Sequence, residues 1–229
     1  MTGHSELRDA VRDLRRRWKP TKVRLQRVSS EHPLVVRMHR SFSWINAASA
    51  QAEDAADEQL VFLWIGLNAL YGRWDGIRKE PESDAKTLKQ LLKRLNELDR
   101  DHLVIKCLEQ NREKIVAVCS DPFLNTVFWR LLDTEKRFHS QRDHYSIQRL
   151  YREENWPLVL DELIQRIYLI RCQLVHGAAT YGGSLNRKTV ALCADIMQGL
   201  MEAFVTVIID YGLHENWDDL CYPPVRESE

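Results

Sequence analysis

The chain has 229 residues, of which 44% are apolar and 29% are charged, and its 33 basic and 33 acidic side chains give a formal net charge of zero. This length and composition suit one large domain, with or without extensions, and exclude a disordered chain, a collagen-like repeat and a disulfide scaffold. The balanced total also excludes the uniformly basic surface of a protein that coats nucleic acid through overall charge.

The charges are unevenly distributed along the chain. Residues 1–40 hold eleven basic and four acidic side chains, a net charge of +7, whereas the stretch from Glu215 onward holds five acidic residues and one arginine. The five cysteines form no Cys-x-x-Cys pair and no metal-ligand spacing with histidine, so we expect no metal site. Their odd number, the lack of an apolar leader and the lack of an apolar run of roughly 18 residues favour a reducing cytoplasm and no membrane.

Apolar residues recur at helical spacing from the beginning of the chain. Four apolar residues separated by steps of three and four lie on one face of a first helix. We expect this helix to end at Pro20. These four are Leu7, Val11, Leu14 and Trp18. A second helix is expected from Pro33. An acidic turn from Glu53 then precedes a helix that is apolar all round, which indicates burial on several sides, and that ends at Gly72.

The polar side of the first helix is rich in arginine. Arg12, Arg15 and Arg16 suggest a phosphate-binding arm that delivers RNA to a cleft. Two other interpretations stay open. The arginines also fit a solvated amphipathic helix, or a helix that docks on the acidic tail of a second copy of the chain.

The middle of the chain alternates polar breaks with short apolar periods. We expect, in order, a loop over 73–84, a helix from Ser83 or Asp84 to Leu98, a helix capped by Asp101 that extends past Ile115, a helix opened by Asp121-Pro122, and a bend over His139–His144. Two long helices follow, from Trp156 to Gly177 and from Ser184 or Asn186 to about Gly212. Since no segment alternates as a strand would, the expected fold is an all-α antiparallel helical bundle.

The most specific local feature is the end of the first of these long helices, Ile170-Arg171-Cys172-Gln173-Leu174-Val175-His176-Gly177. Arg171 interrupts an apolar stretch, so its guanidinium needs a partner or a route out of the core. Five residues turn a helix by about 140°, so one regular helix cannot aim Arg171 and His176 at one point. Either the last turn unwinds at Gly177 or a second copy completes a shared site. The alternative to a functional site is that Arg171 is a surface residue and that His176 is a cation stabilised by the dipole at the end of the helix.

This motif and the residues Gly177–Thr180 and Asn186-Arg187 that follow it resemble the HEPN family (higher eukaryotes and prokaryotes nucleotide-binding), and most of all its Apea-like branch. The upstream segment Leu63–Gly72 resembles the early core helix of that family. The resemblance implies a HEPN-like helical domain over residues 51–212, preceded by a basic helical extension over 1–50 and followed by an acidic tail over 213–229.

The resemblance also implies an activity. Many members are metal-independent endoribonucleases without a cofactor that form homodimers across the motif helix, and they are similar to toxins of toxin–antitoxin pairs and to phage-defence effectors. By the same resemblance Arg171 and His176 are the catalytic residues. The partners would be a second copy, an RNA substrate and an antitoxin or other protein. At Cys172 the family often has Asn, and at Ala178 some members have a modifiable Tyr.

Six further residues accompany the motif as candidates. Cys172 and Asn68 would support Arg171 or His176, although Asn68 also fits a structural hydrogen bond to the backbone. The residues that would contact RNA after the motif are Thr180, Tyr181, Asn186 and Arg187. Capping and loop formation are the simpler roles for most of them. The alternative to a ribonuclease is a non-catalytic HEPN-like module that binds a nucleotide, RNA or a protein partner.

Overall fold

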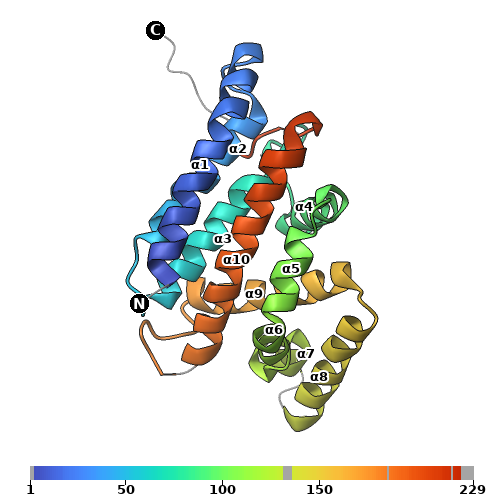
Figure 1. The fold of residues 1–229 in the computed structure, drawn as a ribbon. Helices are drawn as coiled ribbons and strands as arrows, with labels where there is room; N and C mark the ends of the chain where they lie inside the picture. Colours follow the sequence, from blue (N-terminus) through green and yellow to red (C-terminus); the bar gives the residue numbers. More distant parts are fainter. Residues whose placement is uncertain (1–2, 131–135, 185, 218, 223–229) are drawn as a thin grey trace.

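The computed structural model describes residues 3–130, 136–184, 186–217 and 219–222, and these fold almost entirely into helices (Figure 1). The helices are α1 (Gly3–Val28), α2 (Pro33–Ser49), α3 (Ala56–Tyr71), α4 (Asp84–Leu98), α5 (Leu103–Gln110), α6 (Arg112–Cys119), α7 (Thr126–Arg130), α8 (Lys136–Arg152), α9 (Trp156–Val175) and α10 (Arg187–Tyr211). Short 3-10 turns cover Pro122–Leu124 and Gly212–His214. The predicted all-α fold class is therefore confirmed.

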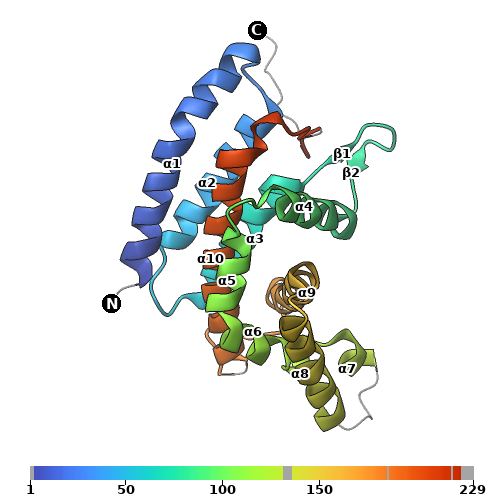
Figure 2. The same cartoon turned by 45° about the vertical axis from the view of Figure 1, so that its right-hand side comes forward.

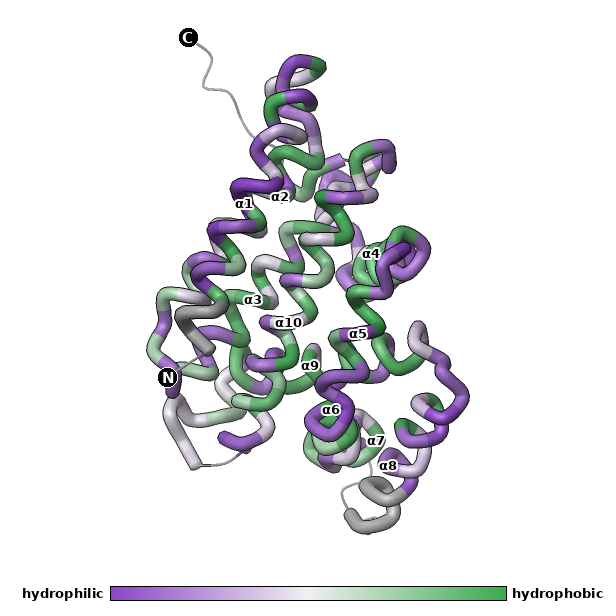
Figure 3. The backbone as a smooth tube through the Cα atoms, viewed as in Figure 1, coloured by the Kyte–Doolittle hydropathy of each residue, from purple (hydrophilic) through white to green (hydrophobic). Residues whose placement is uncertain are grey.

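The long helices α1, α2, α3 and α10 lie side by side and enclose much of the core (Figure 1, Figure 2). Apolar residues of α3 and α10 face inward, and the hydrophilic side of α1 faces outward (Figure 3). The helices α4 and α9 cross these long helices rather than follow them (Figure 2). One hydrophobic cluster joins all these elements, from Leu7 in α1 to Trp217 after α10. Burial of this continuous apolar surface is the main driving force for the fold.

Helix α1 does not end at Pro20, which corrects the sequence-based expectation. It continues through Pro20 to Val28. The reason lies in the apolar positions on either side, because Trp18 is 4% exposed and Leu25 is 7% exposed, both on the face that packs on the core. Their burial offsets the missing backbone hydrogen bond of a proline inside a helix.

Two other expected boundaries are wrong. The segment expected as one helix capped by Asp101 is two helices, α5 and α6, which meet at Asn111. The capping carboxylate belongs to Asp99, whose oxygens accept the Leu103 and Val104 amide N–H groups at 2.7 and 2.8 Å. The buried Asp99 provides two acceptors at once for the orphan donors of α5, so it satisfies the helix start.

The polar segments also contain more regular structure than expected. The loop over 73–84 includes a short antiparallel pair, β1 (Trp74–Asp75) and β2 (Glu80–Pro81). The expected bend over His139–His144 is wrong, because these residues lie inside α8. Polar composition alone misled the interpretation here, since a helix can be polar over most of its surface.

The described part of the C-terminal tail is fastened to α2 by arginine. Arg37 is 2% exposed, and its guanidinium donates to the carbonyl oxygens of Leu70, Gly72, Trp217 and Asp219 at 2.7–3.3 Å. Arg40 donates in the same way to the carbonyls of Cys221 and Tyr222. A buried charge needs such partners, so these bonds fix the described part of the tail against α2.

Within the described residues, one helical stretch is long and apolar enough to cross a membrane. It covers Arg187–His214, and 67% of its apolar window is buried inside the fold. We had expected no segment of this length and apolar composition, and that expectation was wrong. Most of this stretch is α10, which packs against α1, α3, α4, α5 and α6 as a central core helix does.

Candidate functional site

The end of α9 and the turn that follows form a Schellman motif. His176 is the capping residue. The Gly177 N–H donates to the Leu174 carbonyl at 3.2 Å, and the Ala178 N–H donates to the Gln173 carbonyl at 2.8 Å. Gly177 has φ +69°, a conformation that only glycine adopts at little cost. The predicted helix end is confirmed, and the last turn stays helical up to His176 rather than unwinding.

Arg171 lies half-buried on two aromatic rings. Its guanidinium carbon is 5.9 Å from the ring centroid of Trp64 in α3 and 5.9 Å from that of Tyr168 in α9. One guanidinium nitrogen lies 3.8 Å from Cys172 Sγ, a weak contact. Among the described residues, Arg171 forms no ion pair with a carboxylate. The rings hold the side chain without neutralising its charge, which leaves the guanidinium able to bind an anion.

Asn68 is hydrogen-bonded to Tyr71, a tyrosine close enough to Arg171 for the arginine charge to act on it. Tyr71, the last residue of α3, is buried, and its hydroxyl donates to Asn68 Oδ1. Burial raises the pKa of Tyr71, the negative charge of Asp84 raises it further, and Arg171 lowers it. The phenol therefore stays neutral. Asn68 accepts the hydrogen bond of Tyr71, so any support that it gives to Arg171 passes through this tyrosine.

Tyr168 connects Cys172 to the same group of side chains. A hydrogen bond with Cys172 raises the pKa of Tyr168, and Arg171 opposes this rise. The three residues occupy positions i, i+3 and i+4 of α9, which adjoin on a helix surface. We call the residues Asn68, Tyr71, Tyr168, Arg171 and Cys172 the Arg171 cluster.

His176 lies outside the Arg171 cluster. It is exposed at the end of α9, and regular helix geometry turns it by about 140° from Arg171. The two residues expected to be catalytic thus belong to one helix end but point in different directions within one chain. The structure places Cys172 against Arg171, connects Asn68 to Arg171 through Tyr71, and leaves His176 apart.

The residues after the motif are fastened to the start of α3. Arg187 forms an ion pair with Asp57 at 2.8 Å, and the Tyr181 hydroxyl donates to Glu58. The pair with Asp57 raises the pKa of Arg187. These bonds hold the turn between α9 and α10 against the start of α3, which is a structural use of residues expected to contact RNA.

The other two candidates in this turn differ in exposure. Asn186 is the N-cap position of α10 with φ +57°, and its amide lies 3.5 Å from Gln173 Oε1. Thr180 is exposed, and its carbonyl accepts the Gly183 N–H at 2.9 Å. The expected start of the last helix at Asn186 is confirmed.

The arginines of α1 are mostly engaged within the fold. Arg12 and Arg16 form exposed ion pairs with Asp9 and Asp13, at 2.9 and 3.2 Å. Arg15 donates to a carbonyl of α2 and lies over the Phe42 ring. Exposed pairs of this kind contribute little to stability and exchange readily with solvent ions.

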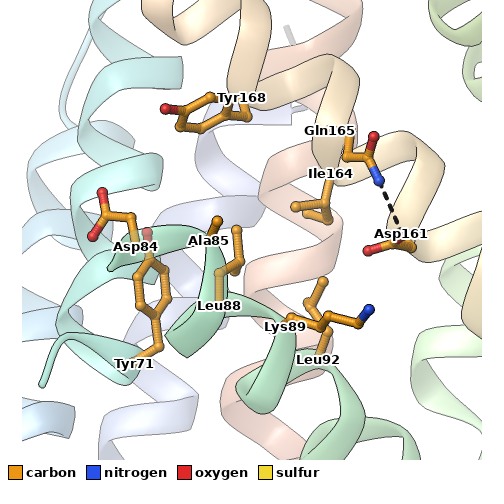
Figure 4. A pocket seen from close by; sticks show the side chains of 10 residues that line it. All are labelled: Tyr71, Asp84, Ala85, Leu88, Lys89, Leu92, Asp161, Ile164, Gln165 and Tyr168. Atoms are coloured by element: carbon orange, nitrogen blue, oxygen red, sulfur yellow. Dashed lines mark hydrogen bonds between the residues drawn. The ribbon is translucent and has the colours of Figure 1, made fainter. Parts of the chain in front are cut away.

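A cavity of about 270 Å³ adjoins the Arg171 cluster (Figure 4). It lies between the end of α3, the first half of α4 and the middle of α9, and Tyr71 and Tyr168 belong to both the cavity wall and the cluster. Its lining consists of Tyr71, Asp84, Ala85, Leu88, Lys89, Leu92, Asp161, Ile164, Gln165 and Tyr168. In the described residues, no three His, Cys, Asp or Glu side chains gather as ligands for a metal ion.

Comparisons of this chain with models of known families, with curated proteins and with solved structures found no match. The HEPN resemblance therefore rests on the residues of this chain alone.

Sequence reasoning missed the tyrosines and the acidic side chain of the site. Tyr168 precedes Arg171 by three residues, so helical spacing was a usable signal for it. Tyr71 and Asp84 come from α3 and α4, and only the tertiary packing brings them to α9. A single sequence contains no local signal for that proximity.

Proposed function

We propose that the protein is a metal-independent endoribonuclease of the HEPN type, with a bundle-like core and an active site shared by two copies of the chain. Its place would be the cytoplasm, in a toxin–antitoxin or phage-defence system. The observation that carries the proposal is Arg171, a half-buried cation held on aromatic rings without an acidic partner among the described residues. An exposed His176 caps the same helix but points away from Arg171 within one chain.

Helix geometry supports a shared rather than a single-chain site. Because α9 stays helical to its cap, Arg171 and His176 of one chain diverge by about 140°. A second copy related by a two-fold axis would bring its own His176 toward Arg171, and the reverse pair would form by the same symmetry.

The surface of α9 supports a partner helix. Leu158, Tyr168 and Val175 are 47%, 40% and 53% exposed, and regular geometry places them within about 100° of one another around the helix. His176 lies at the same angular position as Leu158. Exposed apolar side chains along one helix face are typical of an interaction surface.

The chemistry follows from these two side chains. RNA cleavage without a metal uses the ribose 2′-hydroxyl as the internal nucleophile, so a base must accept its proton and an acid must protonate the leaving 5′-oxygen. Histidine suits both roles, so the one His176 of each site would accept the proton of the 2′-hydroxyl and then, as its imidazolium, donate it to the leaving 5′-oxygen. The products would be a 2′,3′-cyclic phosphate and a free 5′-hydroxyl. Arg171 would hold the phosphate through two parallel N–H groups and stabilise the charge that develops on its oxygens.

Cleavage of a single-stranded RNA in the presence of EDTA tests the proposal. The wild type should cleave, and His176→Ala should lose at least about a hundredfold of the rate, since general acid–base catalysis contributes that much. His39→Ala removes another exposed histidine, from α2, and serves as the matched control with wild-type rate. A fully active His176→Ala protein would overturn the assignment.

The second candidate function is a non-catalytic module that binds RNA, a nucleotide or a protein. It is favoured by Cys172, because the 3.8 Å contact between its thiol and Arg171 replaces a stronger polar partner. Retention of RNA without cleavage by wild type and His176→Ala alike would support this function instead.

A further inference from the structure

The cavity beside the Arg171 cluster has two chemically different ends (Figure 4). Asp84 and Tyr71 lie at one end, and Asp161, Gln165 and Lys89 lie toward the other (Figure 4). The first is the end near Arg171, because Asp84 and Arg171 both act on the pKa of Tyr71. The second end is marked by Asp161, which precedes Arg171 by ten residues on α9. Ten residues correspond to about 15 Å along the helix axis between the two backbone positions.

The walls between these ends are apolar. Leu88 and Leu92 of α4 face Ile164 of α9 across the cavity, and the half-exposed ring of Tyr168 stands at its edge (Figure 4). Clefts that hold whole drug-sized ligands measure roughly 300–1,000 Å³. A volume of about 270 Å³ therefore suits one ring system rather than a whole nucleotide. Aromatic rings beside an apolar slot are how proteins hold single unstacked bases.

The far end of the cavity offers the hydrogen-bond acceptors of a partly exposed carboxylate. Gln165 Nε2 donates to Asp161 Oδ2 at 3.0 Å, which orients the carboxylate. Among the described residues Asp161 forms no ion pair, so its second oxygen and part of the first remain open. Lys89 adds a cationic donor at the same end (Figure 4).

The charges around the cavity favour a neutral ligand. Asp84 and Asp161 are balanced by Lys89 and by Arg171 beside the opening. A free anion would meet two carboxylates, and a cation would meet two basic side chains. A neutral heteroaromatic ring with hydrogen-bonding groups on one edge meets neither penalty.

From this arrangement we infer that the cavity binds one unstacked guanine base of an RNA strand whose phosphate lies at Arg171. Guanine presents two adjacent N–H donors, N1 and N2, next to the acceptor O6 on its pairing edge. The Asp161 carboxylate accepts from both donors, and Lys89 donates to O6. Adenine, cytosine and uracil lack two adjacent donors on that edge. The inference rests on the proposed ribonuclease function and adds the base that it selects.

Two measurements test the inference, and the first does not depend on cleavage. Guanosine 5′-monophosphate should bind the wild-type protein at least about tenfold more tightly than adenosine 5′-monophosphate in a calorimetric titration, because adenine offers the partly exposed Asp161 carboxylate no pair of adjacent N–H donors. Asp161→Asn should remove this preference. Glu162→Gln, a neutral substitution at the next residue of α9, should keep it, and circular dichroism should show both variants folded.

The second measurement maps cleavage on an RNA that contains all four bases. Cuts should fall next to guanosine, and replacement of guanosine by inosine, which lacks the N2 amino group, should slow cleavage about tenfold or more. Cleavage at every base alike, unchanged in Asp161→Asn, would overturn the inference and leave the ribonuclease proposal intact. Selective guanosine monophosphate binding without any cleavage would support the cavity assignment and reject the ribonuclease. Absence of both would reject both.

Discussion

Arg171 and Arg187 lie on either side of the same turn but have different kinds of neighbours. Arg187 pairs with Asp57, whose side chain is only 10% exposed, so the charge of Arg187 neutralises a carboxylate within the fold. Arg171 lies over two rings and has no acidic partner among the described residues. Arg187 thus has a structural role in this chain, whereas the contacts of Arg171 leave its charge available to a ligand.

This difference predicts opposite effects of the same substitution. Arg187→Gln should lower the free energy of unfolding by about 2 kcal/mol, because Asp57 would stay buried without its cation. Arg171→Gln should lower it by less than about 1 kcal/mol, the usual contribution of a partly exposed cation–π contact. Urea unfolding of the two variants measures both values. Equal losses would mean that Arg171 is as structural as Arg187.

At the scale of single elements, the sequence predicts helices well where local chemistry decides them. The Pro33 start of α2, the Gly72 end of α3 and the Gly177 end of α9 all depend on residues within one turn. The errors come from tertiary packing. Pro20 sits inside α1 because residues on both sides of it pack on other helices.

The position of Pro20 gives a prediction for α1. Because Pro20 is exposed and lacks the N–H that would donate to the carbonyl of Arg16, Pro20→Ala should add a helical hydrogen bond. We expect the free energy of unfolding to rise by about 2 kcal/mol, which is the helix penalty of proline less its restraint of the unfolded chain. Lys19→Ala, an exposed neighbour, should change it by less than about 0.5 kcal/mol. An unchanged stability of the Pro20→Ala protein would contradict this prediction, and a lower stability would show that the helix needs its proline.

At the scale of the whole molecule, long-range contacts are what the sequence conceals. The carbonyl partners of Arg37 lie 33 to 182 residues away along the chain, and no local pattern marks this arginine as buried. The same holds for the candidate site. Arg171 and Cys172 could be singled out from one helix, but Tyr71 and Asp84 reach them only because α3, α4 and α9 pack together.

A shared site also has a consequence that only the whole assembly can test. If Arg171 of one copy acts with His176 of the other, Arg171→Ala and His176→Ala proteins should each be inactive. Mixed and allowed to exchange subunits, they should regain about a quarter of the wild-type rate. Half of the dimers would then be mixed, and each mixed dimer would hold one complete and one empty site.

The measurement is RNA cleavage by the mixture after subunit exchange, with the two single variants as controls and a sizing column to establish the dimer. If both residues instead acted within one chain, every copy in the mixture would lack one of them, and no rate would return. The divergence of Arg171 and His176 around α9 makes the first outcome the expected one. A monomer on the sizing column would remove the second copy and therefore the shared site.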